Sequence, residues 1–395
     1  MAVMASCQNQ DEPIPNTGDQ VTADFPKGSV VKDVTVKISD ENRTRAGEEN
    51  SFPLWNLSAG KPGSDLSNNL SISYGVYYAN GTLFYSKDME QFNYNGEKTT
   101  VLIPLPAGEQ SAKIFMWVSK GFADGKRPAN IDWEKKSVTQ ERMPVSNFGC
   151  NDDAFCAYLE DIDLTSESLS IDITLKRPFT QVNIITDEFY GPTDKAAASR
   201  AQNFLDGHTQ IASDFGLLES AEDQTIYVPK TWYWEDDTFD MEASTRNQFF
   251  LRNWVGYDTN WDFLTKTYDG EFANLNLTNQ DSYFAIFKGV KKRYIGVFYV
   301  LSPRNMAKWK DKKTSKTFNE CVFRVYNSYS STPTKKIEGT FDYDMSKANT
   351  RWVITNDLDA GGGIFSDYQN FNVSIQENFE GNTYSIQQGT MTDQQ

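Results

Sequence analysis

The chain has 395 residues, and its 38 Lys and Arg against 54 Asp and Glu give a formal net charge of −16. This acidic surplus excludes nucleic acid and anionic lipid as partners, because both are bound through clustered Lys and Arg, and the single histidine, His208, excludes a zinc site with two histidine ligands. At about 100–200 residues per domain the length predicts two domains, and the 14% of aromatic residues favours sheet over helix.

Near the start, Met4-Ala5-Ser6-Cys7 has the form of a lipoprotein processing site, in which an apolar residue and two small ones precede the cysteine that is lipidated. A complete export signal has a basic region and about 7–15 apolar residues before that site, so we expect the natural start to lie further upstream. The alternative is an ordinary free cysteine in an unstructured tail. The polar run behind Cys7 predicts a tether, and residues 1–20 are therefore assigned to a signal remnant, lipidation site and tether.

The first predicted strand is followed by an exposed target for proteases. Val34, Val36 and Ile38 alternate with polar residues, and the polar loop behind them carries Arg43 and Arg45. Exposed polar loops are preferred sites of proteolytic cleavage, and a cut after Arg45 would free the strand to leave. Its loss would expose unpaired ladder groups and an apolar groove, which a strand from another molecule could fill.

Short runs of alternating apolar and polar residues, broken by Gly, Asn, Asp and Pro, continue through the first half of the chain. This pattern is typical of antiparallel β-sandwiches. Asn80-Gly81 between two such runs is a strong signal for a tight hairpin. Further strands are predicted over 72–78, 82–85, 101–106, 113–118 and 169–175.

Three cysteines remain if Cys7 is lipidated. Cys150 and Cys156 flank a short polar segment and could form a disulfide in an oxidising compartment. Cys321 would then be left over. Three unpaired thiols are the alternative.

The break at Lys176-Arg177-Pro178 lies near the middle of the chain and predicts a domain boundary. We expect an N-terminal β-sandwich over 21–176 and a C-terminal one over 177–395, with one short helix at 194–205, where three alanines follow one another. The predicted fold class is thus all-β, with two tandem antiparallel sandwiches. Strands are predicted in the second half over 179–185, 225–229, 282–287, 294–301, 321–326, 351–355 and 371–375.

The segment Thr231-Trp232-Tyr233-Trp234 places two tryptophans on one side of a predicted strand, beside acidic residues. Exposed aromatic rings next to carboxylates could stack on a sugar ring, which makes Trp232 and Trp234 a candidate glycan platform. Aromatic residues packed beneath an edge loop are the alternative.

The sequence lacks the motifs that predict an enzyme. It has no nucleophile elbow, no phosphate-binding loop with its lysine and no dinucleotide fingerprint. The acidic loop that begins near Asp357 carries Tyr368 where a calcium loop has its bidentate Glu. The sequence therefore predicts no catalytic residue, no metal site and no cofactor.

Six short motifs, in their order along the chain, resemble the fimbrilins of Bacteroidales, the subunits of type V pili. The chain is most similar to the fimbrilin-like outer-membrane lipoproteins with two sandwiches, and Asp11 and Glu12 resemble the acidic signal that directs Bacteroidetes lipoproteins to the cell surface. The motifs are Met4–Cys7, Thr44–Gly47, Leu175–Ile184, Tyr294–Leu301, Asn349–Leu358 and Phe371–Gly381.

This resemblance implies two transthyretin-like domains and export of a lipidated precursor to the outer membrane at the cell surface. It also implies cleavage by an arginine-specific surface protease between Arg45 and Ala46, with Arg43 as the second choice. Assembly with other fimbrial subunits, identical or related, would follow by donor-strand exchange, in which a C-terminal segment completes the sheet of a neighbour. The candidate donor residues alternate along the chain and are Phe371, Val373, Ile375, Tyr384 and Ile386.

Two functions follow from these features. The first is a structural or adhesive subunit of a cell-surface fimbria that is activated by cleavage. The alternative is a surface lipoprotein that does not polymerise and binds host or bacterial glycans through a β-sandwich. In both cases the chain is not an enzyme, and it contacts the membrane only through the lipid anchor of its precursor.

Overall fold

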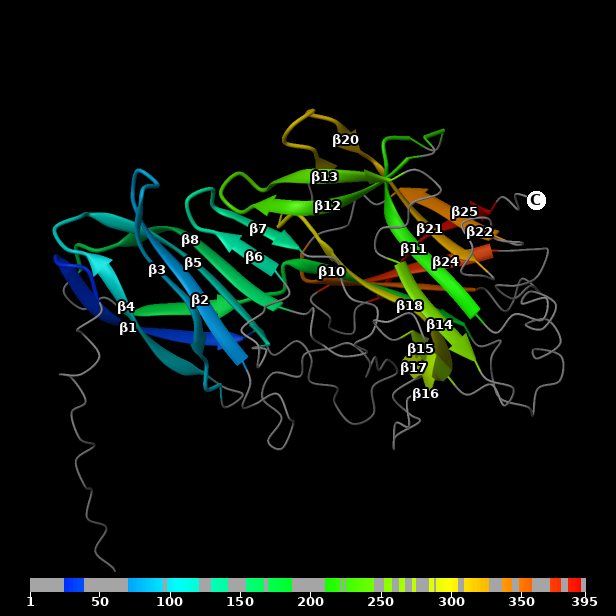
Figure 1. Ribbon diagram of the computed structural model, residues 1–395, viewed down its shortest axis with the longest axis horizontal. Coiled ribbons are helices and arrows are strands. Elements are labelled where there is room, and N and C mark those ends of the chain that lie inside the picture. The colour runs from blue at the N-terminus through cyan, green and yellow to red at the C-terminus, as the bar shows by residue number, and fades with distance from the viewer. Residues whose placement is uncertain are drawn as a thin grey trace, which may run out of the picture.

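The computed structural model consists of strands joined by turns and loops (Figure 1). Every regular element in the part that it describes is a strand, which confirms the all-β prediction. No helix among these residues is long and apolar enough to cross a membrane. The predicted helix at 194–205 lies outside them. The described residues are 25–38, 70–94, 98–120, 129–140, 154–166, 170–186, 210–244 except 221 and 224, 252–257, 263–266, 272–274, 284–304 except 288, 309–326, 336–342, 348–356, 370–377 and 383–391.

The first half of the chain contains the strands that the alternating pattern predicts and three more. They are β1 (Ser29–Ile38), β2 (Leu70–Tyr78), β3 (Leu83–Gln91), β4 (Thr99–Pro106), β5 (Ser111–Lys120), β6 (Ala129–Asp132), β7 (Ser137–Gln140), β8 (Ala154–Asp163) and β9 (Ile171–Leu175). The predicted hairpin joins β2 to β3, where Gly81 takes a φ of 85° that side-chain-bearing residues avoid and its amide donates to the carbonyl of Tyr78.

Seven of these strands form an N-terminal sandwich of two sheets. One sheet has the order β4-β1-β9 and the other the order β3-β2-β5-β8. Apolar side chains from both sheets make a common core between them, which includes Val34 of β1, Ile72 of β2 and Ile114 of β5. This packing follows from the period of two along each strand, since alternate side chains point to the same face.

The sheet with β5 is buried on its second face too. Ile114, Met116 and Val118 of β5 belong to the core of the sandwich, whereas Phe115 and Trp117 belong to a second core that extends into the other half of the chain. The continuous apolar run of β5 is therefore explained by a strand with both faces covered.

The strands of the second half belong to a 16-stranded sheet, apart from the small β19-β20 pair. They are β10 (Phe179–Thr186), β11 (Gln210–Leu218), β12 (Ile226–Tyr233), β13 (Thr238–Ser244), β14 (Arg252–Tyr257), β15 (Phe263–Lys266), β16 (Phe272–Asn274), β17 (Phe284–Phe287), β18 (Val290–Leu301), β19 (Trp309–Lys310), β20 (Thr317–Phe318), β21 (Glu320–Tyr326), β22 (Lys336–Asp342), β23 (Thr350–Asn356), β24 (Asn370–Glu377) and β25 (Thr383–Met391).

This large sheet folds over itself around the second core. The Phe215 ring of β11 packs against Phe298 of β18 and Trp352 of β23, with ring centroids 6.1 and 6.2 Å apart. Most neighbouring strands are antiparallel as predicted, but β1 with β9 and β10 with β23 are parallel pairs.

The two halves of the chain are joined by a sheet as well as by the link between β9 and β10. The β6-β7 hairpin comes from the first half, yet β7 pairs with β12 of the large sheet. In Figure 1 the β12-β13 hairpin extends from the second half toward the first and lies beside β7. The predicted boundary at residue 176 thus falls between sheets that share side-chain contacts and one strand ladder.

Candidate functional site

The first strand is the centre of its sheet. β1 runs antiparallel to β4 from Ser29 to Val36 and parallel to β9 from Val34 to Ile38. Its backbone is therefore paired on both sides over Val34–Val36. Removing β1 would leave one unpaired edge on β4 and another on β9, facing each other across the vacated position.

The three residues predicted to anchor this strand are all buried. Val34 and Val36 are 0% exposed and Ile38 is 1% exposed. Each apolar side chain of this size contributes about 1.5–3 kcal/mol when it is fully buried. The loss of β1 would therefore open a long apolar groove as well as two strand edges.

Tyr94, which no sequence pattern predicts as part of the site, holds the end of β1. The Tyr94 hydroxyl accepts a hydrogen bond from the Ile38 amide at 3.2 Å and donates one to the Ile38 carbonyl at 3.4 Å. The ring is 2% exposed and stacks on Phe92, with centroids 5.8 Å apart. Ile38 is the last residue of β1, so Tyr94 fixes the point where the chain leaves toward the arginine-containing segment. That segment, with Arg43, Arg45 and Ala46, lies outside the described residues, as does Cys7.

The candidate donor residues lie on two strands that are already paired within the same chain. Phe371, Val373 and Ile375 belong to β24, which lies between β23 and β25. Tyr384 and Ile386 belong to β25, which pairs with β24 along its length and with β22 at two positions. Donation of this segment to a neighbour would require the β24-β25 hairpin to leave its own sheet.

The two tryptophans proposed as a glycan platform are buried between the halves of the chain. Trp232 and Trp234 are 1% and 0% exposed. The Trp234 ring stacks on Phe115 of β5 with centroids 4.0 Å and planes 7° apart, and Trp133 packs edge-on at 6.1 Å. The prediction of an exposed platform is therefore wrong. Both rings are covered because the β12-β13 hairpin packs against β5 and the β6-β7 hairpin.

The residue after Trp234 adds charged contacts to this interface. Glu235 accepts hydrogen bonds from Lys113 at 3.2 Å and from Lys136 at 2.6 Å, both of which come from the first half of the chain. Partial burial alone would raise the pKa of the Glu235 carboxyl, but the two ammonium groups outweigh that effect and hold the pKa below its ordinary value of 4.5.

Glu235→Gln will remove a stabilising contribution that is present at neutral pH and lost in acid. Because folding lowers the pKa of this carboxyl, the contribution exists above the ordinary value of 4.5 and disappears as the pH falls through the lower folded value. The Glu235 side chain is 40% exposed, and for such a pair we expect a loss of at most about 1 kcal/mol near pH 7 and a smaller loss near pH 3. Urea unfolding at both pH values measures it. Glu109→Gln, in the exposed turn between β4 and β5, is the matched control, and an equal effect of both variants would contradict the assignment.

Among the described residues Cys156, one of the two cysteines of the predicted disulfide, has no disulfide partner. Cys156 carries a free thiol, and its side chain points into the core shared by the two halves. Cys150 lies outside the described residues. Burial raises the pKa of the Cys156 thiol to about 12 and also raises that of the free, buried Cys321, so both thiols stay protonated at neutral pH.

Among the described residues no three potential metal ligands gather in one place. A comparison with models of protein families finds no match, and neither does a search of curated proteins.

Solved structures of fimbrial proteins are similar to this chain over most of its length. The tip fimbrial protein Mfa3 of Porphyromonas gingivalis is 8% identical with a TM-score of 0.38, covering 88% of this chain and 99% of its own. The fimbrial anchor protein Mfa2 of the same organism is 10% identical with a TM-score of 0.34, covering 88% and 97%. A fimbrial assembly protein of Parabacteroides distasonis is 9% identical with a TM-score of 0.34, covering 91% and 100%. These identities and scores are low, so the function proposed below rests on the geometry of the chain itself.

Proposed function

We propose that this chain is a structural or adhesive subunit of a cell-surface fimbria. It is exported as a lipoprotein precursor with Cys7 as the lipidated residue, cleaved after Arg45 and assembled by donor-strand exchange. Its partners are other fimbrial subunits and an arginine-specific surface protease. The residues 21–176 and 177–395 are its two domains.

The position of β1 is the observation that carries this proposal. This strand is the centre of its sheet, it comes first among the described strands, and two arginines follow it within a few residues. A cut after Arg45 would leave β1 attached to the sandwich only by non-covalent contacts.

The energies involved favour replacement of β1 over an empty groove. Three buried aliphatic side chains contribute about 1.5–3 kcal/mol each, and each ladder hydrogen bond adds about 0.5–1.5 kcal/mol. When β1 leaves, the sandwich loses both contributions. An extended segment with alternating apolar residues would restore them, so the groove binds such a segment strongly. The acceptor strand edges are β4 and β9.

The fold restricts which strand can act as the donor. The β24-β25 hairpin completes the sheet of its own chain. The donor is therefore this hairpin after it has opened, or a strand of a related subunit. Burial of Trp232 and Trp234 removes the observation that favoured a glycan-binding lipoprotein built on those two rings.

Substitution of both arginines tests the proposal. We expect the wild-type chain, expressed in cells with an arginine-specific surface protease, to give ladders of high molecular weight that resist SDS. The double variant Arg43→Ala and Arg45→Ala keeps β1 in place and will give monomer only.

Arg127→Ala is the matched control, because it removes an arginine between β5 and β6 and should leave the ladders unchanged. Circular dichroism establishes that each variant folds. Ladders that persist in the folded double variant would contradict cleavage-dependent assembly.

A further inference from the structure

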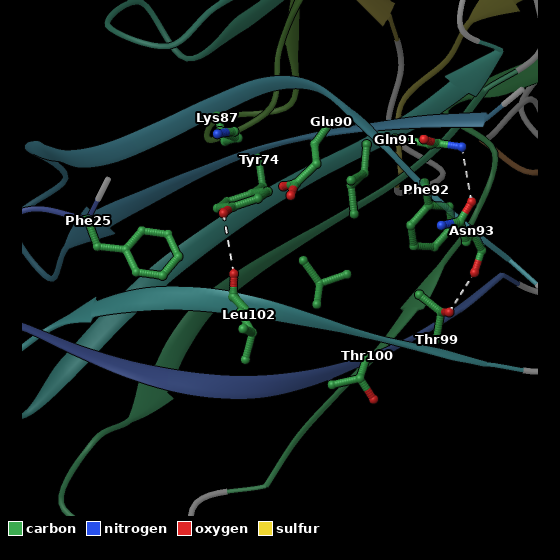
Figure 2. Close-up of a pocket in the computed structure, with 12 residues that line it drawn as sticks. Phe25, Tyr74, Lys87, Glu90, Gln91, Phe92, Asn93, Thr99, Thr100 and Leu102 are labelled. Atoms are coloured by element: carbon green, nitrogen blue, oxygen red, sulfur yellow. Dashed lines mark hydrogen bonds between the residues drawn. The ribbon is translucent and has the colours of Figure 1, made fainter. Parts of the chain in front are cut away.

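A groove opens on one side of the N-terminal sandwich, between β3 of one sheet and β4 of the other (Figure 2). It has a volume of about 510 Å³. Ile72 and Tyr74 of β2 line it, together with residues of β3 and β4, and Phe25 enters it from the segment before β1. Pockets that hold small organic ligands have volumes of about 300–1,000 Å³, so the groove has room for one or two sugar rings.

Both strands beside the groove carry features that oppose the addition of another strand. In β3, Asp88 and Met89 together lie opposite Ser73 as a bulge, with Met89 at a φ of 54°. In β4, Pro104 and Pro106 have no amide hydrogen to donate. Bulges, charged side chains and prolines are the usual means by which edge strands avoid pairing. An extended peptide is thus a poor occupant of this groove.

The lining combines hydrogen-bonding groups of both kinds. Glu90 points its carboxylate into the groove beside Tyr74 (Figure 2) and can only accept hydrogen bonds. Gln91 and Asn93 bring amides that both donate and accept, and they bond to each other at 3.3 Å. Lys87 and Glu90 are the two charged residues of the lining, so its formal charges sum to zero. A ligand that suits this lining is uncharged and rich in hydroxyl groups.

Apolar surface lies next to these polar groups. The Phe25 ring is partly exposed at one end of the groove and packs edge-on against Tyr85, with centroids 5.8 Å apart. The Tyr74 hydroxyl of β2 donates to the Leu102 carbonyl of β4 at 3.4 Å and so links the two sheets beside the groove (Figure 2). An aromatic ring beside polar acceptors complements a sugar, which has apolar C–H faces and polar hydroxyl edges.

From this lining we infer that the groove between β3 and β4 is a binding site for neutral saccharides. Glu90 accepts hydrogen bonds from sugar hydroxyls, Gln91 and Asn93 contribute further ones, and Phe25 contacts a ring face. The site lies away from the buried Trp232 and Trp234, and it belongs to the N-terminal sandwich alone. It gives the proposed adhesive role a ligand class in the intact chain, and it does not depend on polymerisation. Phe25 precedes Arg45, so cleavage there would remove the ring contact.

Titration of the intact chain with sugars tests the inference. The probes are galactose, mannose, N-acetylglucosamine, lactose and maltose, and binding is followed by saturation-transfer NMR and calorimetry. We expect at least one of them to bind with a Kd of about 1 mM or below. Glu90→Gln weakens a charge-assisted acceptor and should raise that Kd by about 5- to 10-fold. Glu160→Gln is the matched control, because Glu160 is exposed on β8 at the opposite edge of the same sheet, and it should leave the Kd unchanged.

Three outcomes would overturn the inference. These are no binding by any of the five sugars, an equal effect of Glu90→Gln and Glu160→Gln, or binding that Glu90→Gln leaves unchanged. Since the intact chain is used, a failure of cleavage has no influence on the result. The same titration on the intact chain with Phe25→Ala should show weaker binding, because the ring contact at one end of the groove is lost.

Discussion

Trp234→Ala will lower the free energy of unfolding by about 3–5 kcal/mol, the cost of removing a large buried aromatic ring from a core. Trp234 is 0% exposed and stacks on Phe115 at a centroid distance of 4.0 Å. It also meets Trp133 of the turn between β6 and β7. Its loss would leave a cavity between residues of the first and second halves.

Trp234→Ala also weakens the contact between the two halves of the chain, because the cavity lies between them. Because Trp234 belongs to the second half and its partners to the first, the variant weakens the contact that makes the halves unfold together. We expect the wild type to unfold in one urea transition and the variant in two. Intrinsic fluorescence and limited proteolysis, followed through the transition, measure the effect.

Tyr233→Ala is the matched control for Trp234→Ala. Tyr233 is the neighbouring residue, is partly exposed, and its hydroxyl donates to Asp240 within the same hairpin at 3.0 Å. Its removal should cost about 1 kcal/mol and leave a single transition. If the two variants lost equal stability, the interface would not depend on the Trp234 stack.

Val36→Asp will destabilise the intact precursor by about 3–5 kcal/mol, as expected for a buried charge without a partner. Val36 is 0% exposed in the core of the sandwich, and its backbone pairs with β4 on one side and with β9 on the other. Lys37→Asp is the matched control, because Lys37 is the next residue of β1 and is exposed. It should cost less than about 1 kcal/mol.

The same two variants also show whether β1 is still present in the assembled subunit. If β1 leaves after cleavage, Val36→Asp is absent from the fibre and cannot change its stability. We expect fibres made from this variant to melt like those of the wild type, although the precursor melts at a lower temperature. Variant fibres that melt at a lower temperature than wild-type fibres would mean that β1 stays in place.

The burial of β1 could be predicted from the sequence because solvent reaches only one face of this strand. Val34, Val36 and Ile38 point inward and are buried, while Lys37 between them is exposed. Apolar and polar residues therefore alternate along β1, and the extent of this alternation predicts the ends of the strand to within a few residues.

The location of Trp232 and Trp234 could not be predicted in the same way. An exposed platform and a buried interface both place two aromatic rings on one side of a strand, so the local pattern is the same. The difference arises from Phe115, which is more than a hundred residues away along the chain. The continuous apolar run of β5 is a local sign that both faces of its sheet are covered.

Short strands and single hydrogen bonds could not be predicted either, because they leave no local pattern in the sequence. β6 and β7 have four residues each, too few to establish a period. Tyr94 acts through its hydroxyl on the Ile38 backbone, and no pattern of side chains reports such a contact. The groove between β3 and β4 depends on which strand edges remain uncovered, a property of the sheet order rather than of either strand.

The mature N-terminus of the assembled protein shows whether β1 is lost on assembly. SDS-resistant material should be isolated from intact cells and its N-terminal residue identified by sequencing and mass spectrometry. We expect Ala46, with β1 and all preceding residues absent. Assembled subunits that begin at Cys7, or at any residue before Val34, would retain β1 and contradict strand exchange at this site.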